Sequence, residues 1–136
     1  GTSDRHGAEM KFNSLIAENI YWRNSATFTV AEDGNGTRVT RRPKWTGLTA
    51  VDWNNDKWTN TAEYLFTGEH LDIDSSTYAT ITKPKVGIAN FHTNYAIDGK
   101  SNLVFSLNNV FDKTYERPDG YAQHGRNLLL TYKLKF

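Results

Sequence analysis

The sequence predicts an all-β fold in which one antiparallel sheet forms part of a transmembrane β-barrel. Three observations support this prediction. Apolar and polar residues alternate with a period of two in seven segments, and a strand places successive side chains on opposite faces. The connections between these segments alternate between short and long. No apolar run approaches the roughly 18 residues expected of a transmembrane helix.

The composition argues against several other classes of protein. The chain has 136 residues, a net charge of +1 and no cysteine, which excludes a disulfide scaffold and a cysteine metal site. The weak net charge gives no indication of a nucleic-acid partner. No catalytic triad order, paired carboxylates or phosphate-binding loop is evident, so we expect neither an enzyme nor a cofactor. Aromatic residues make up 13% of the chain, and several stand near expected strand ends, where barrels carry aromatic belts.

The last segment, Gly125–Phe136, shows the alternation most clearly. One parity is wholly apolar and comprises Leu128, Leu130, Tyr132, Leu134 and Phe136. The other parity comprises Asn127, Leu129, Thr131, Lys133 and Lys135. The length suits a membrane-crossing strand, which needs roughly 9–11 residues when tilted. A half-buried strand of a soluble sandwich is the alternative for this segment alone.

Six further segments alternate more weakly and are also expected to be strands. They are Gly7–Ala17, Ile20–Ala31, Trp45–Trp53, Trp58–His70, Val86–Ile97 and Asn102–Phe111. The short connections are Glu18-Asn19, Asn54–Lys57 and Asp98–Lys100, and the long ones are Glu32–Pro43, Leu71–Lys85 and Lys113–His124. Outer-membrane barrels sort their connections in this way, with short periplasmic turns and long outside loops. Arg38, Ser75 and Gly120 should therefore lie outside the cell.

The alternation also assigns side chains to the two faces of the barrel wall. We expect Phe91, Phe105, Leu130 and Leu134 to contact lipid, and His92, Asn108, Lys133 and Lys135 to face the lumen. Bacterial single-chain barrels have even strand numbers, and an open edge in lipid leaves costly unpaired backbone groups. Seven strands therefore indicate part of a larger barrel.

The sequence near the end resembles the C-terminus of TonB-dependent outer-membrane receptors. The motif begins with Asn109-Val110-Phe111-Asp112-Lys113 and Tyr115, continues with Gly120-Tyr121 and Gly125-Arg126, and ends with an alternating strand closed by Phe136. Arg41–Lys44 and Tyr64–Gly68 also resemble family segments, so the similarity covers roughly residues 41–136 well and the first forty loosely.

The resemblance implies that residues 1–136 are the C-terminal part of a barrel of about 22 strands whose lumen holds a plug. It implies active transport in the outer membrane of a Gram-negative bacterium, driven by the TonB complex through that plug. A ferric siderophore is the expected cargo, with cobalamin or haem as alternatives. The expected partners are the rest of the barrel, lipid, lipopolysaccharide and the barrel-assembly machinery. A passive porin-like barrel and a soluble β binding module remain the other function classes.

Candidate site residues lie mainly in the outside loops. The ligand-binding candidates are Arg38, Arg41, Arg42, Tyr78, Arg117 and Tyr121. The final strand resembles an assembly signal through Leu130, Tyr132, Leu134 and Phe136, with the C-terminus in the periplasm. Asp112 and Lys113 are expected to form a local turn. Asp72 and Asp74 are expected in a solvated loop, and His70 and His124 at the surface, so no metal site is expected.

Overall fold

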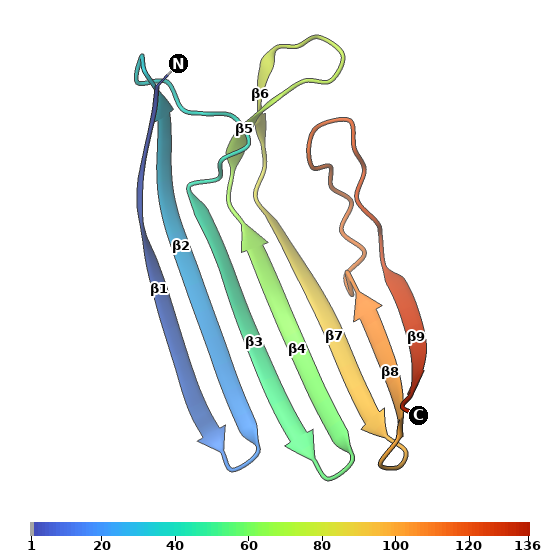
Figure 1. Ribbon diagram of the computed structural model, residues 1–136. Coiled ribbons are helices and arrows are strands. Elements are labelled where there is room, and N and C mark those ends of the chain that lie inside the picture. The colour runs from blue at the N-terminus through green and yellow to red at the C-terminus, as the bar shows by residue number, and fades with distance from the viewer. Residues whose placement is uncertain (1) are drawn as a thin grey trace.

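The computed structural model describes residues 2–136 as a seven-stranded antiparallel sheet and a separate two-stranded sheet (Figure 1). The large sheet has the order β1-β2-β3-β4-β7-β8-β9. Its strands are β1 (Ser3–Ala17), β2 (Ile20–Asp33), β3 (Trp45–Asn55), β4 (Trp58–Thr67), β7 (Val86–Ala96), β8 (Ser101–Asn108) and β9 (Asn127–Leu134). Residues 2–136 contain no helix, and so no helix that could cross a membrane. The predicted all-β antiparallel architecture is confirmed.

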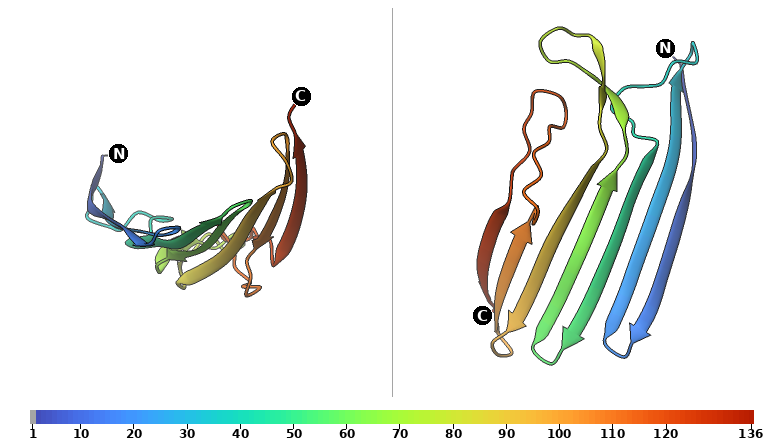
Figure 2. Two further views of the ribbon diagram at one scale, coloured as in Figure 1. Left: turned by 90° about the horizontal axis from the view of Figure 1, so that it is seen from below. Right: turned by 180° about the vertical axis from the view of Figure 1, so that it is seen from behind.

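The seven-stranded sheet is a single curved layer without a core of its own. Seen along the strands, it forms a trough with β1 and β9 at its two rims (Figure 2). Among residues 2–136, Ala50 is the one fully buried apolar side chain. Soluble domains instead bury one face of a sheet against a second layer. Both faces of this sheet therefore need material that lies outside the described residues.

The two faces of the sheet differ in chemistry as the alternation predicted. Cross-strand pairs put Phe105 opposite Leu130 and Phe91 opposite Leu107, so these side chains share the apolar face. The pair His92 and Ser106 belongs to the other, polar face. Because strand side chains alternate, the same division runs through all seven strands.

Aromatic pairs border the apolar face at both ends of the strands. Phe28 and Trp45 pack with ring centroids 4.8 Å apart at one end, and Trp58 packs on Tyr95 at 4.5 Å at the other. On β3, Trp45 and Trp53 are eight residues apart, which corresponds to about 26 Å of strand, or about 20 Å of height at a tilt of about 40°. This is close to the apolar band of about 25 Å in outer-membrane barrels.

The two ends of the sheet carry different connections. At the turn end, tight hairpins join β1 to β2, β3 to β4 and β7 to β8, and at the loop end the connections are long (Figure 1). The prediction that residues 71–85 form a plain loop is wrong, because β5 (His70–Ile73) and β6 (Thr80–Lys83) pair there as a second sheet. Asp74 closes this hairpin by accepting hydrogen bonds from the amides of Ser76 and Thr77. Four-residue strands are too short to show a clear period.

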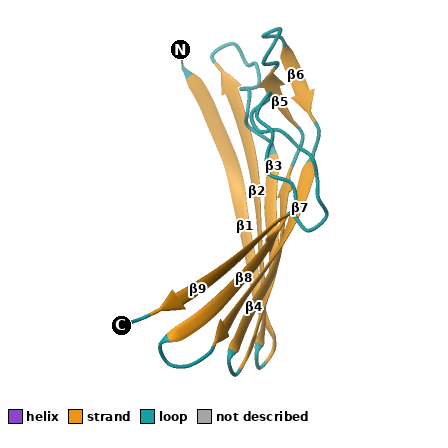
Figure 3. Cartoon of the chain, turned by 90° about the vertical axis from the view of Figure 1, so that its right-hand side faces the viewer, coloured by secondary structure: helices purple, strands orange, loops and turns teal. Residues whose placement is uncertain are grey.

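The connections at the loop end do not fold over the mouth of the trough. Figures 2 and 3 show β5, β6 and the segment between β8 and β9 displaced toward the convex side of the sheet. Tyr64 and Phe66 of β4 line a pocket together with residues 113–117 of that last segment. Because Tyr64 and Phe66 share the parity of Ala62, which pairs with Phe91, the convex side is the apolar face.

Candidate functional site

A buried carboxylate ties three loop-end segments together. Asp72 in β5 is 1% exposed. Its Oδ1 accepts hydrogen bonds from Arg41 Nε and from the Ile73 amide, both at 2.8 Å. Its Oδ2 accepts one from the amide of Asp119 at 2.8 Å. One side chain thereby joins the β2–β3 connection, the β5–β6 hairpin and the β8–β9 connection, and we call this arrangement the Asp72 clamp.

A second carboxylate strengthens the contact between the hairpin and the last connection. Asp119 accepts a hydrogen bond from the Ser75 amide at 2.9 Å and forms an ion pair with Lys83 of β6. Glu116 also contacts Lys83 Nζ, at 3.3 Å, and accepts the amide of Gly120 at 3.0 Å. Lys83 is therefore paired with Asp119 and Glu116 within the loops.

The electrostatics of the clamp keep both aspartates ionised. The ion pair with Lys83 and the hydrogen bond from Ser75 lower the pKa of Asp119 to about 2. Burial raises the pKa of Asp72, but the hydrogen bonds from Arg41 and from the Ile73 and Asp119 amides outweigh burial and leave its pKa below the ordinary value. A buried carboxylate is tolerated only when it is paired and hydrogen-bonded in this way.

The motif at the end of β8 holds the base of the last connection. Asn109 is 3% exposed, and its Nδ2 donates to the carbonyls of Lys113 at 2.9 Å and His124 at 3.2 Å. Its Oδ1 accepts the Lys113 amide at 2.9 Å. Asn109 thus joins the two ends of the segment 113–124, and the predicted local turn at Asp112 and Lys113 is confirmed.

Two further motif positions are explained by backbone contacts. Asp112 Oδ1 accepts the amide of Arg126 at 2.7 Å, which ties the start of β9 to the turn. Gly120 has a φ of +82°, and a Cβ there would lie 2.7 Å from Ser75 Oγ. The left-handed conformation and the close approach together favour glycine. Three of the motif residues, Asn109, Asp112 and Gly120, therefore help to shape the loop.

The structure separates the ligand-binding candidates into different places. Arg41 is held by Asp72, and Arg117 donates to Thr67 Oγ1 at 3.3 Å and lines the convex-side pocket. Tyr78 at the hairpin tip and Tyr121 are 82% and 67% exposed. Arg38 is half-buried and Arg42 is exposed, both in the β2–β3 connection. The six residues do not converge on one site.

Two expectations for this region were wrong. Asp72 was expected in a solvated loop, but it is the buried centre of the clamp. His70 was expected at the surface, yet it is 6% exposed and its Nδ1 lies 3.1 Å from the Gly68 carbonyl oxygen. Both residues are covered because the β8–β9 connection packs onto β5, a contact between segments more than forty positions apart. His124 is exposed, as expected.

The polar face carries an ordered network that sequence reasoning did not identify. Arg23 Nε donates to Asp52 Oδ2 at 2.5 Å, and Thr61 Oγ1 donates to Asp52 Oδ1 at 2.7 Å. On the neighbouring strands, Glu63 accepts Asn90 Nδ2 at 3.0 Å and lies 3.6 Å from His92 Nε2. The signal was a charged residue at the same parity in successive strands. No group of three or more residues suited to holding a metal ion occurs within residues 2–136.

The residues predicted to form an assembly signal lie on the apolar side of the edge strand. Leu130 pairs with Phe105 and Tyr132 with Leu103 on β8. Leu130, Tyr132 and Leu134 are 60%, 58% and 46% exposed, and Phe136 projects beyond the strand. The far edge of β9 pairs with no strand among residues 2–136.

Comparison with known proteins agrees with this architecture. No protein-family model matches the chain. The vitamin B12 transporter BtuB of Vibrio cholerae serotype O1 is 28% identical over 115 residues, which cover 78% of this chain and 18% of that protein.

Two solved receptors of Pseudomonas aeruginosa share the fold. The outer-membrane ferripyoverdine receptor, bound to ferripyoverdine, superimposes with a TM-score of 0.80 at 20% identity over 98% of this chain and 20% of that one. The ferric enterobactin receptor PfeA superimposes with a TM-score of 0.82 at 20% identity, over 96% of this chain and 22% of that one. The chain thus spans about a fifth of the length of the proteins it matches. It is homologous to BtuB, and its open sheet matches part of the barrel of TonB-dependent outer-membrane receptors, as the resemblance in its sequence predicted.

Proposed function

We propose that this chain is the C-terminal part of the barrel wall of an active transporter in the outer membrane of a Gram-negative bacterium, and that the complete protein imports a ferric siderophore. One observation supports the barrel-wall part of the proposal: an open, single-layer antiparallel sheet with an apolar convex face has the fold of TonB-dependent receptors over nearly its whole length. Such a sheet suits lipid on one side and a lumen on the other.

The free edges of the sheet support a larger barrel. β1 and β9 each have one edge without a partner among residues 2–136, and every unpaired backbone group in lipid costs several kcal/mol. Further strands would pair with both edges and complete a barrel of about 22 strands around a plug. The TonB complex would act through that plug. The hairpins and the end of β9 share the turn end (Figure 1), which we assign to the periplasm, and the assembly machinery would read β9.

The other function classes fit less well. A soluble β module would bury its apolar face in a core, whereas Met10, Phe12 and Leu130 are 72%, 55% and 60% exposed. The matched proteins are named as transporters and receptors, which favours neither an enzyme nor a passive porin. Haem lacks support because His70 is buried against a carbonyl.

Cobalamin is the second candidate cargo, and a specific observation favours it. A sequence relative over most of this chain is a vitamin B12 transporter. The structural matches to ferripyoverdine and ferric enterobactin receptors are at 20% identity and carry the fold alone. Loops that determine the ligand would come mostly from the remainder of the barrel.

A growth experiment separates the candidates. The gene that encodes the complete protein is deleted and restored in trans, and growth is measured on ferric siderophores as the sole iron source and on cobalamin in a cobalamin-requiring strain. Loss of growth on one siderophore, restored by the gene and abolished again by removing TonB, supports the first proposal. Loss confined to cobalamin supports the second. Unchanged growth on both would refute import of either cargo.

A further inference from the structure

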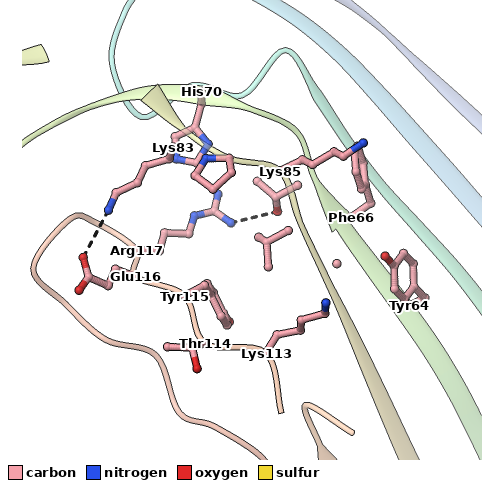
Figure 4. A pocket seen from close by; sticks show the side chains of 14 residues that line it. Tyr64, Phe66, His70, Lys83, Lys85, Lys113, Thr114, Tyr115, Glu116 and Arg117 are labelled. Atoms are coloured by element: carbon pink, nitrogen blue, oxygen red, sulfur yellow. Dashed lines mark hydrogen bonds and ion pairs between the residues drawn. The ribbon is translucent and has the colours of Figure 1, made fainter. Parts of the chain in front are cut away.

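The convex side of the sheet carries a pocket that lies outside the trough (Figure 3). The cavity has a volume of about 660 Å³ and lies where the loop ends of β4 and β7 meet residues 113–117 (Figure 4). Its wall includes three aromatic rings (Tyr64, Phe66, Tyr115), four cations (Lys83, Lys85, Lys113, Arg117) and the carboxylate of Glu116. The wall therefore combines apolar surface with positive charge.

The pocket opens at the border of the apolar face, outside the trough. Tyr64 and Phe66 belong to the apolar parity of β4, and the segment that completes the pocket leans over the convex side (Figure 3). The Phe28–Trp45 pair marks the loop-end border of the apolar band on β2 and β3, and Phe66 pairs with Gly87 at the corresponding level of β4 and β7. In a membrane, this level coincides with the lipid headgroups.

Three of the four cations in the pocket wall have no ion-pair partner in the described part of the chain. Lys85, Lys113 and Arg117 form no ion pair with any carboxylate among residues 2–136. Lys83, the fourth cation of the wall, differs because its ammonium group pairs with Glu116 and Asp119. Figure 4 shows the contact with Glu116 at the edge of the group of lining side chains, while Lys113 extends from the loop toward the strands. Arg117 is positioned by Thr67 and keeps further N–H donors available.

Small residues lie on the apolar face beside the pocket. Tyr64 lies across Gly87, where a Cβ would come within 1.7 Å of the tyrosine hydroxyl. The next positions on this face are Ala62 and Ala89, which pair with Phe91 and Tyr64. Small side chains thus continue from the cationic pocket into the apolar face.

We propose that this pocket binds a phosphate group of a membrane-lipid headgroup in the leaflet at the loop end. Arginine and lysine are the usual phosphate ligands, Tyr64 and Phe66 would contact the glycolipid or acyl part, and the apolar face would accommodate the chain. The proposal rests on the apolar face being in lipid, and it is independent of the transported cargo.

The test uses the complete protein, purified in detergent and titrated with diphosphoryl lipid A while bound lipid is counted by native mass spectrometry. A pocket variant, Lys85→Gln, Lys113→Gln and Arg117→Gln, is compared with a variant that loses three charges elsewhere, Lys11→Gln, Lys133→Gln and Lys135→Gln. Because each charged contact contributes substantially, the pocket variant should bind roughly tenfold or more weakly. The control variant should bind diphosphoryl lipid A as the wild type does. Zwitterionic phosphatidylcholine should bind the wild type and the pocket variant equally.

Several outcomes would overturn the proposal. They are equal binding by the pocket variant, an equal loss in the control, or full competition by millimolar inorganic phosphate, which would indicate an anion site without lipid selectivity. Heat-modifiability on electrophoresis verifies that both variants fold. Cargo uptake is measured in parallel, and a pocket variant that loses uptake but keeps lipid binding would assign the pocket to the transported ligand instead. Failure of the siderophore proposal alone would leave lipid binding unaffected.

Discussion

The substitution Asp72→Asn tests whether the Asp72 clamp holds the outer segments as one unit. An asparagine can still accept hydrogen bonds from Arg41 and Ile73 through Oδ1, but its Nδ2 group would face the Asp119 amide, donor against donor. The lost hydrogen bond to a charged acceptor corresponds to about 1.5–3 kcal/mol. The ion pair with Arg41 adds less, since that side chain is 55% exposed.

Native-state hydrogen exchange is the appropriate assay, because opening of the clamp is local rather than global. The loss of about 1.5–3 kcal/mol converts to exchange that is about 10- to 150-fold faster at the amides around Asp119. A matched control is Asp74→Asn. Asp74 accepts only the amides of Ser76 and Thr77 in its own turn, so the control should loosen the hairpin tip and leave residues 115–122 protected.

Two results would refute this reasoning. If exchange around Asp119 stays within a factor of about two of the wild type, the buried carboxylate does not hold the β8–β9 connection. If the Asp74→Asn control accelerates the same amides equally, the segments are coupled through the hairpin as a whole and not through Asp72.

Three further predictions follow from the same contacts. Phe105→Arg should impair membrane assembly far more than Ser106→Arg, because arginine on the lipid-facing side at the midplane costs roughly 2–4 kcal/mol; equal folded yields by heat-modifiability would show that the two faces are misassigned. Asn109→Ala should expose the base of the last connection to protease much more than Asn108→Ala, whose side chain donates only to a neighbouring strand; equal cleavage rates would contradict that role. The folded-state pKa of Asp119 is about 2, below an unfolded value of about 3.9, so its contribution is present above about pH 4 and is lost as the pH falls from about 4 to 2. Pepsin cleavage of this connection should rise in that window, and a flat rate would contradict the assignment.

The alternation of side chains was sufficient to predict the strands and their two faces. Whether Phe105 or Ser106 faces lipid depends only on parity along one strand, which the local sequence contains. The short turns could also be predicted from the sequence, because their contacts are local. Asp98, for example, accepts hydrogen bonds from the amides of Lys100 and Ser101 in its own hairpin. Such contacts join residues two or three positions apart, within the range of a local pattern.

Only the tertiary structure decided the organisation of the loop end. Asp72 meets Arg41 across 31 positions and Asp119 across 47, and neither spacing leaves a periodic signal. From the sequence alone, a carboxylate in a polar segment is expected to be solvated. Its burial becomes evident only when the position of the segment that covers it is known. The same holds for the convex-side pocket, since Lys85 and Lys113 line one cavity only when the last connection leans outward over β4 and β7. Strand chemistry is a local property of the sequence, whereas burial and charge pairing in the loops arise from contacts between distant segments.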